Sequence, residues 1–348
     1  YGILKSSDAY LRFVFLTGVT KFSKVSVFSD LNHLVDISMN KRYANICGIS
    51  ETELIECFEP EIQALADENS ITREEMLAAL KKHYDGYNFS KTGEDIYNPY
   101  SLLNAFNDGT LRNYWFETGT PTFLAKMVQR ASFINIKSME SEIRVSVDFI
   151  NSYRASMNDP FPILYQSGYL TIKGYDKDYD QYVLGFPNEE VEYGFLNELM
   201  GLYMQEAGAY GSEFDSPNFV RDLNSNNVEG FMTRLRAFFA SMSNRLKNKD
   251  EKDFQTVFYL LFKLMGQFVE TEYDSAIGRA DAVVFAKTTI YVFEFKMSGN
   301  GTAEDAMRQI NDRKYALPFT ASGKNLVKIG VEFSVDKDER NIVRWTVG

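Results

Sequence analysis

An apolar strand interrupted by two charged side chains, residues 290–296, constrains the fold of this chain more than any other feature. The strand reads Ile-Tyr-Val-Phe-Glu-Phe-Lys. Because side chains alternate between the two faces of a strand, Glu294 and Lys296 project from one face, and Phe293 and Phe295 from the other. A carboxylate and an ammonium in such a strand are costly to desolvate unless they meet each other, a metal or a water-filled cleft. The strand therefore predicts a packed sheet that opens into a cleft.

The segments before this strand complete the predicted core. Residues 253–268 form a helix that is apolar on nearly every side and must be buried, and residues 280–285 form a second strand. Asp281 lies thirteen positions before Glu294, so a hairpin can bring the two carboxylates together. A third element, a helix capped by Thr302 with Asp305 at its third position, carries Gln309 and can return past the same place.

Two carboxylates and a lysine suit phosphodiester hydrolysis. Carboxylates hold Mg²⁺ or Mn²⁺ better than zinc because these hard cations prefer oxygen ligands. The metal lowers the pKa of a bound water, and a lysine positions that water or stabilises the developing charge. We therefore expect Asp281, Glu294 and Lys296 to be catalytic, although Lys296 as the mere salt-bridge partner of Glu294 is the alternative.

Length and charge limit the other possibilities. A chain of 348 residues suggests two or three domains, and we expect three: 1–125, 126–205 and 206–348. The net charge of −11 argues against non-specific coating of nucleic acid, because phosphate binding depends on many Lys and Arg contacts. A nuclease can still be acidic if a local basic groove and the metal offset the phosphates.

The sequence gives no sign of a membrane or of a secreted scaffold. No apolar run approaches the roughly 18 residues that span a bilayer, and we find no signal peptide, so the cytoplasm is the expected location. Cys47 and Cys57 lack a CxxC or Cys/His pattern, which supports neither a disulfide framework nor a zinc site. His33 and His83 have no nearby nucleophile pattern and are expected to be ordinary histidines.

The expected first domain is mostly helical. Residues 13–16 form a short apolar strand that has no partner strand nearby, so the chain reads as one entered midway. Ser50 with Glu53, and Thr72 with Glu75, predict helix starts with capping boxes. The aromatic loops 83–89 and 97–100 are expected to be structural.

The expected second domain is similar to a winged-helix module. A helix at 160–167, a strand at 169–172, a polar turn at 175–181 and a strand at 182–184 give the order helix, strand, hairpin turn, strand. The turn is acidic and would repel phosphate, which favours a scaffold or protein-contact role over DNA binding.

These residues resemble the PD-(D/E)xK nuclease superfamily, whose motif matches Asp281 and Glu294-Phe295-Lys296 over roughly residues 250–335. Residues 13–30 are similar to the sensor-strand region of AAA-ATPase-like proteins of gut and oral anaerobic bacteria that carry this nuclease domain at their C-terminus. Further signatures are similar to that family: Asp85-Gly86-Tyr87, Tyr97-Asn98-Pro99, residues 114–119 and residues 185–190.

The resemblance implies a mixed, multidomain α/β protein: a helical ATPase-lid remnant, the winged-helix-like segment and a restriction-endonuclease-like α/β core. It also implies Asp281, Glu294 and the Phe295 carbonyl as metal ligands, and Gln309 as an orienting residue. No GxxxxGK[ST] sequence exists in the chain, so we expect no ATP binding through a P-loop here. The superfamily's first-helix carboxylate has no clear match, and Asp253, Glu270 or Glu272 would have to substitute.

Three functions follow as expectations. The first is Mg²⁺-dependent DNA cleavage, coupled to an ATPase module that lies N-terminal to this sequence, with a homo-oligomer as a further possibility. The second is a non-catalytic interaction protein that uses the nuclease fold as a platform, which the acidic charge favours. The third is a DNA-binding regulator that uses the winged helix.

Overall fold

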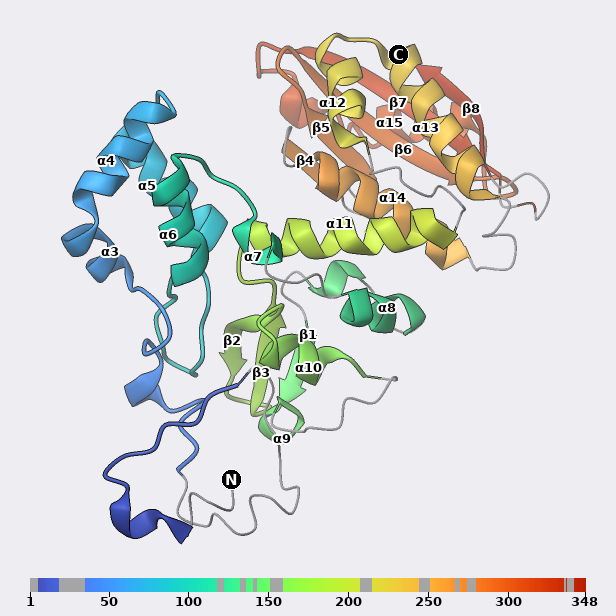
Figure 1. Cartoon of the computed structure of the whole chain (residues 1–348). Coiled ribbons are helices and arrows are strands. Elements are labelled where there is room, and N and C mark those ends of the chain that lie inside the picture. Colours follow the sequence, from blue (N-terminus) through green and yellow to red (C-terminus); the bar gives the residue numbers. More distant parts are fainter. Residues whose placement is uncertain are drawn as a thin grey trace. The chain divides into compact units, whose positions relative to one another are not determined.

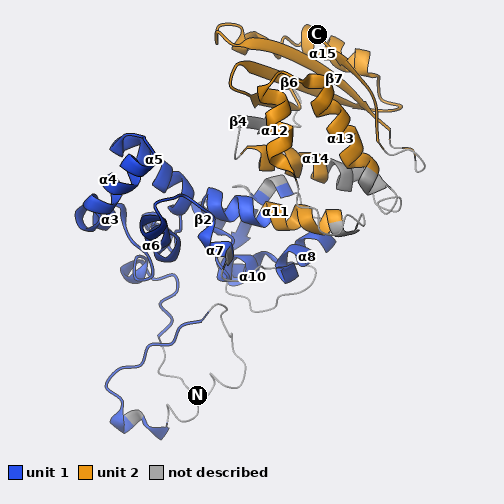
Figure 2. Ribbon diagram, turned by 45° about the horizontal axis from the view of Figure 1, so that its top comes forward, with its two compact units in different colours: residues 1–195 blue, residues 196–348 orange. Residues whose placement is uncertain are grey.

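The computed structural model describes two compact units, Tyr1–Phe195 and Leu196–Gly348 (Figure 2). The described residues are 6–18, 35–117, 122–131, 136–139, 143–150, 159–206, 215–243, 251–266, 270–273, 280–334, 336 and 341–348. None of the helices in these ranges combines the length and the apolar character that a membrane crossing requires. Mixed α/β architecture, as predicted, is confirmed.

The first part of unit 1 is a bundle of short helices (Figure 1). Its elements are η1 (Asp8–Tyr10), η2 (Lys41–Tyr43), α3 (Glu51–Cys57), α4 (Glu59–Glu68), α5 (Arg73–Tyr84), α6 (Pro99–Asp108) and α7 (Tyr114–Glu117). The two predicted capping boxes are confirmed, at Ser50 with Glu53 and at Thr72 with Glu75. The predicted aromatic loops 83–89 and 97–100 are shorter in the structure, because α5 extends to Tyr84 and α6 begins at Pro99. Tyr84 and Tyr97 are fully buried in the core of this bundle, which agrees with the structural role expected of these rings.

The second part of unit 1 is a small antiparallel sheet in the order β1-β3-β2. Its elements are α8 (Thr122–Arg130), η3 (Ile136–Met139), β1 (Ile143–Ser146), α9 (Val147–Ile150), α10 (Phe161–Gln166), β2 (Thr171–Asp176) and β3 (Gln181–Gly185). The predicted helix and hairpin are present, whereas β1 was not predicted. The turn is shorter than the predicted 175–181, because Tyr175 pairs with Tyr182 across the strands and their rings lie 5.2 Å apart.

Buried polar contacts tie the two parts of unit 1 together. The Asn188 side chain donates to the Asp85 carbonyl at 3.0 Å, and the Glu190 carboxylate accepts from the Trp115 backbone N–H at 2.9 Å. Glu190 is fully buried, and its burial raises the pKa of its carboxyl. Glu190 lies in the first turn of the helix that begins at Glu189, where the helix dipole favours a carboxylate, and it also caps α7 from within the core.

Unit 2 is a five-stranded sheet with helices on both faces. A long helix, α11 (Glu189–Glu206), leads into it. Its further elements are α12 (Ser216–Asn224), α13 (Val228–Ser243), α14 (Glu251–Met265), β4 (Glu270–Tyr273), β5 (Ala282–Phe285), β6 (Thr289–Met297), α15 (Ala303–Asp312), η5 (Leu317–Phe319), β7 (Asn325–Phe333) and β8 (Ile342–Val347). The strand order is β4-β5-β6-β7-β8, and only the pair β6 and β7 is parallel.

The two faces of the sheet in unit 2 have different coverings. On one face, Phe293 of β6 packs against Phe231 of α13 and Phe262 of α14, with ring centroids 5.7 and 5.4 Å apart. On the other face, α15 lies so close to β7 that a Cβ at Gly330 would come within 2.3 Å of a backbone oxygen of that helix. The predicted alternation along β6 is confirmed, since Phe295 packs on Phe258 of α14.

The expected strand at the start of the chain has no partner among the described residues. Residues 11–18 form no described strand, and the side chains of Tyr10, Phe13 and Phe15 are exposed. The rest of the segment that is similar to a sensor region, residues 19–30, lies outside the described residues.

We expect Gly86→Ala to destabilise unit 1 by roughly 2 to 4 kcal/mol. Gly86 has a φ of +101°, and an added Cβ would lie 2.1 Å from the Pro187 carbonyl oxygen. Urea unfolding followed by Trp115 fluorescence in a Trp345→Phe background measures the effect within this unit.

The matched control for this substitution is Gly174→Ala in β2, where an added Cβ makes only ordinary contacts with Val183 at 3.9 Å. An equal loss of stability in both variants would show that the positive φ of Gly86 and its close approach to Pro187 are not the cause.

Candidate active site

The register of β6 with its neighbours brings the predicted site residues together. Ala282, the first residue of β5, pairs with Phe293, so Asp281 comes beside Glu294 and Phe295. Asp281 itself lies just before β5, whereas the sequence predicted it within a strand at 280–285. Its Oδ2 accepts the backbone N–H of Phe295 at 2.8 Å, which fixes the carboxylate at the edge of β6.

A hydrogen-bond network on the α15 face joins the other predicted residues. The Lys296 ammonium donates to Glu294 Oε1 at 3.2 Å and to Gln309 Oε1 at 2.6 Å. The Gln309 amide nitrogen donates to Glu294 Oε1 and, at 3.2 Å, to the Tyr315 hydroxyl. Because the oxygen of the Gln309 amide accepts from a lysine, its nitrogen must face the carboxylate, which sets the orientation of the amide. The structure therefore assembles Asp281, Glu294, Lys296 and Gln309 in one place.

Tyr315 is the member of this network that the sequence did not identify. It follows Gln309 by six residues, beyond the end of α15. Only the return of the chain after the helix brings its hydroxyl back to the Gln309 amide. The only local signal for this contact is the position of a tyrosine just beyond the end of the helix that carries Gln309.

Burial dominates the electrostatics of the site. Glu294 is 2% exposed, and burial together with the neighbouring Asp281 raises the pKa of its carboxyl from 4.5 to about 7. The hydrogen bond and charge of Lys296 act in the opposite direction but do not cancel the effect. Burial and repulsion by a neighbouring carboxylate both disfavour the ionised form of a carboxyl group. A cation bound nearby would favour the ionised form again.

The donor set fits a divalent metal ion. Glu294 Oε2 is buried and has no hydrogen-bond partner among the described residues, although Oε1 has two donors. An anionic oxygen left in this way beside the Asp281 carboxylate is a suitable ligand for a hard cation. The described residues contain no group of three or more His, Cys, Asp and Glu that could hold a metal.

Other sequence candidates lie elsewhere or outside the described part. Asp253 lies in α14, and Glu270 and Glu272 lie in β4, but their side chains are not among those described. His33 lies outside the described residues. His83 is half-buried in unit 1, with Nδ1 4.0 Å from Glu189, which agrees with an ordinary packed histidine.

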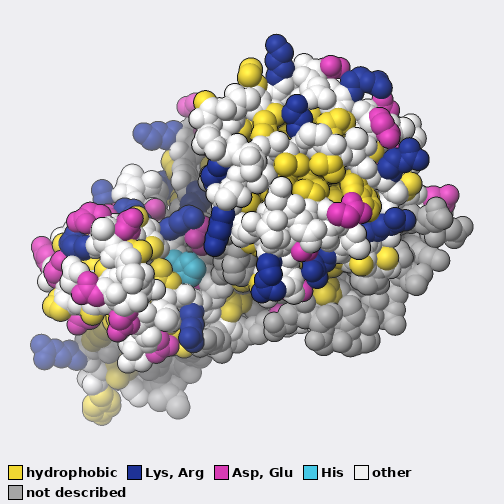
Figure 3. All heavy atoms as spheres, turned by 90° about the horizontal axis from the view of Figure 1, so that it is seen from above, with side chains coloured by type: hydrophobic (Ala, Val, Ile, Leu, Met, Phe, Trp, Pro, Cys, Tyr) yellow, Lys and Arg dark blue, Asp and Glu magenta, His cyan; other side chains and the backbone are white. Residues whose placement is uncertain are grey.

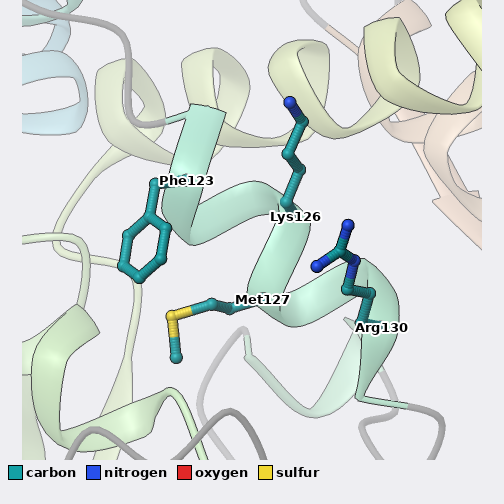
Figure 4. A pocket seen from close by; sticks show the side chains of 4 residues that line it. All are labelled: Phe123, Lys126, Met127 and Arg130. Atoms are coloured by element: carbon teal, nitrogen blue, oxygen red, sulfur yellow. The ribbon is translucent and has the colours of Figure 1, made fainter.

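A small pocket of about 70 Å³ lies on α8 in unit 1 (Figure 4). It is lined by Phe123, Lys126, Met127 and Arg130. This lining offers no carboxylate to bind a metal and no hydroxyl or thiol nucleophile. The site on β6 therefore remains the strongest candidate active site among the described residues.

The order helix, strand, strand, strand, helix, strand around this site agrees with a known family. Residues 249–345 match the family model of the PD-(D/E)XK nuclease superfamily. The C-terminal part of this chain is a PD-(D/E)XK nuclease superfamily domain. This confirms that the C-terminal residues resemble this superfamily, whose nucleases generally use divalent metal ions.

A longer relative aligns with the whole chain. The chain is 35% identical over 359 residues to a protein of Azotobacter chroococcum mcd 1 described as an uncharacterized protein in the vnfD 5′ region. The alignment covers all of this chain and 65% of that relative, so the chain spans about two thirds of its length. No solved structure matches.

We expect Glu294→Gln to stabilise the metal-free protein more at pH 8 than at pH 5. Since the folded-state pKa of Glu294 is raised to about 7, the native state holds this proton where the unfolded state has lost it. Stability contributed by the protonated carboxyl is therefore lost as pH rises from about 4.5 through 7. The amide of the variant cannot ionise, so the variant does not lose this stability. Between pH 5 and pH 8 its free energy of unfolding should therefore gain on the order of 2 kcal/mol relative to that of the wild type.

Urea unfolding of both proteins in EDTA at the two pH values measures this difference. A constant difference between variant and wild type across the range would show that Glu294 titrates normally.

Proposed function

We propose that this protein is a Mg²⁺- or Mn²⁺-dependent nuclease that hydrolyses DNA phosphodiester bonds in the cytoplasm. The observation that carries the proposal is the buried Glu294 carboxylate, which has one oxygen without a partner among the described residues and a raised pKa, beside Asp281. It lies in a domain that matches a nuclease superfamily.

Each residue of the site has a proposed task. Asp281 and Glu294 would hold the metal ion, and the Phe295 carbonyl would add a third oxygen ligand. The bound ion would supply Lewis-acid polarisation of a phosphate oxygen and a water of lowered pKa. Lys296 supports the attacking water and stabilises negative charge, and Gln309, fixed by its contacts to Lys296 and Glu294, orients the water.

Unit 1 would couple this site to an ATPase module outside this sequence. The exposed apolar segment that includes Phe13 and Phe15 supports this, since it offers apolar side chains that another element can cover. A longer relative, of which this chain spans 65%, leaves room for such a module.

The small sheet of unit 1 has the order of elements expected of a winged helix. The helix α8, strand β1, helices α9 and α10 and the hairpin β2–β3 follow one another, with β1 pairing to β3. The hairpin turn carries Asp178 and Asp180, and Asp176 at the end of β2 is paired with Arg144. These acidic groups favour a protein contact over DNA binding, and so speak against a regulator that reads DNA with this module.

A non-catalytic platform is the second candidate function. The 3.2 Å ion pair between Lys296 and Glu294 supports it, because such a pair can stabilise the fold without any metal. The net charge of −11 also favours it, since phosphate binding is weakened by negative charge.

Cleavage assays with matched variants distinguish the two candidates. We expect the wild type to cut plasmid or single-stranded DNA with Mg²⁺ or Mn²⁺ and not with EDTA. Lys296→Met and Asp281→Asn should each reduce the rate by about 100-fold or more, because each removes a group that acts on the reacting phosphate.

Lys287→Met is the matched control, because Lys287 is an exposed lysine in the turn between β5 and β6, far along the hairpin from the site. It should cut at the wild-type rate. No cutting by any form, with the longer protein and ATP included, would favour the platform.

A further inference from the structure

The turn that ends α15 is fixed by backbone hydrogen bonds. The Lys314 N–H donates to the Asn311 carbonyl at 3.2 Å, and the Tyr315 N–H donates to the Ile310 carbonyl at 3.1 Å. This pattern, with a left-handed residue just beyond the helix, is a Schellman-type end. The backbone of the turn, from which these side chains project, is therefore fixed.

Lys314 occupies the left-handed position of this turn, with a φ of +56°. Glycine or asparagine usually fills this position, because a Cβ there costs roughly 1–2 kcal/mol. A long cationic side chain at a position that favours glycine points to a use for that side chain.

Arg313 and Lys314 are two adjacent exposed cations that no other side chain neutralises. Neither side chain has a hydrogen bond or ion pair within the described parts of the chain. Other cations of the same domain are engaged: Arg308 with Asp305 at 3.0 Å, Arg344 with Glu304 at 3.6 Å, Lys328 with Asn311 at 2.7 Å and Lys324 with the Ala286 carbonyl at 2.9 Å. The pair at the turn is thus available to an external anion.

This turn is connected to the active site through one side chain. The Tyr315 hydroxyl accepts from the Gln309 amide at 3.2 Å, and the same amide accepts from Lys296 at 2.6 Å. A phenol that accepts one hydrogen bond can still donate its own proton. Arg313 and Lys314 therefore directly precede a tyrosine whose hydroxyl is hydrogen-bonded to the site residue Gln309.

We propose that Arg313, Lys314 and Tyr315 form a phosphate-binding turn that holds the backbone of a DNA strand beside the Glu294 site. The proposal rests on the proposed nuclease function and names how the substrate is held. The two cations would contact neighbouring phosphates, and the Tyr315 hydroxyl would donate to a phosphate oxygen.

An acidic protein needs such a local element to bind DNA. Figure 3 shows acidic side chains gathered at the left, over helices α3 to α6, and Lys and Arg side chains spread over the surface of unit 2. The net charge of −11 would oppose a DNA strand over much of the molecule, so a few well-placed cations must guide it to the site.

The test measures binding without cleavage. Fluorescence anisotropy of a labelled DNA duplex, in Ca²⁺ and over a series of salt concentrations, is compared for the wild type and Arg313→Ala/Lys314→Ala, with a gel to confirm that the DNA stays intact. The control is Arg236→Ala/Lys287→Ala, which removes the same charge from α13 and from the turn between β5 and β6, where both side chains are exposed.

Loss of two phosphate contacts should weaken binding about tenfold or more and reduce the salt slope of log affinity by about 1.8, whereas the control should keep the wild-type slope. An unchanged slope in Arg313→Ala/Lys314→Ala, an equal change in the control, or a wild type that does not bind DNA would overturn the proposal. Binding that depends on the turn without any metal-dependent cleavage would retain the proposal and reject the nuclease.

Discussion

The burial of the Glu294 carboxylate is the constraint on which the rest of the C-terminal domain depends. A carboxylate that is 2% exposed must have partners, and the fold supplies Lys296 and Gln309 on one oxygen. To bring them there, β6 must lie beside β5 and β7, and α15 must approach β7 so closely that Gly330 has no room for a side chain. The other oxygen receives no partner from the described residues, and for this reason we propose that the site binds a cation.

Much of this site could be predicted from local sequence. Alternation along residues 290–296 separates Glu294 and Lys296 from the phenylalanines, which do pack on α13 and α14. Helix starts were predictable from capping boxes because these act within four residues. The pairing of β6 with β7, the third strand β1 and the contact between Tyr315 and Gln309 depend on long-range packing, for which no local pattern exists.

Buried polar side chains have different surroundings in the two units. In unit 1, Glu190 and Asn188 tie a helical bundle to a small sheet through hydrogen bonds to backbone groups, although Glu190 Oε2 has no hydrogen-bond partner among the described residues. In unit 2, polar groups converge on a site instead and leave one oxygen unmatched. Each unit thus contains a buried glutamate with one oxygen that has no partner among the described residues. What distinguishes Glu294 is the second carboxylate beside it, Asp281, together with the network through Lys296 and Gln309.

Direct measurement of Mn²⁺ binding tests the central claim, that Asp281 and Glu294 form a divalent metal site. Isothermal titration calorimetry of the wild type, Glu294→Gln and Lys287→Met separates metal binding from any cleavage. The account predicts saturable binding to the wild type and to Lys287→Met, and its loss in Glu294→Gln. Equal binding in all three proteins, or no binding to the wild type, would contradict it.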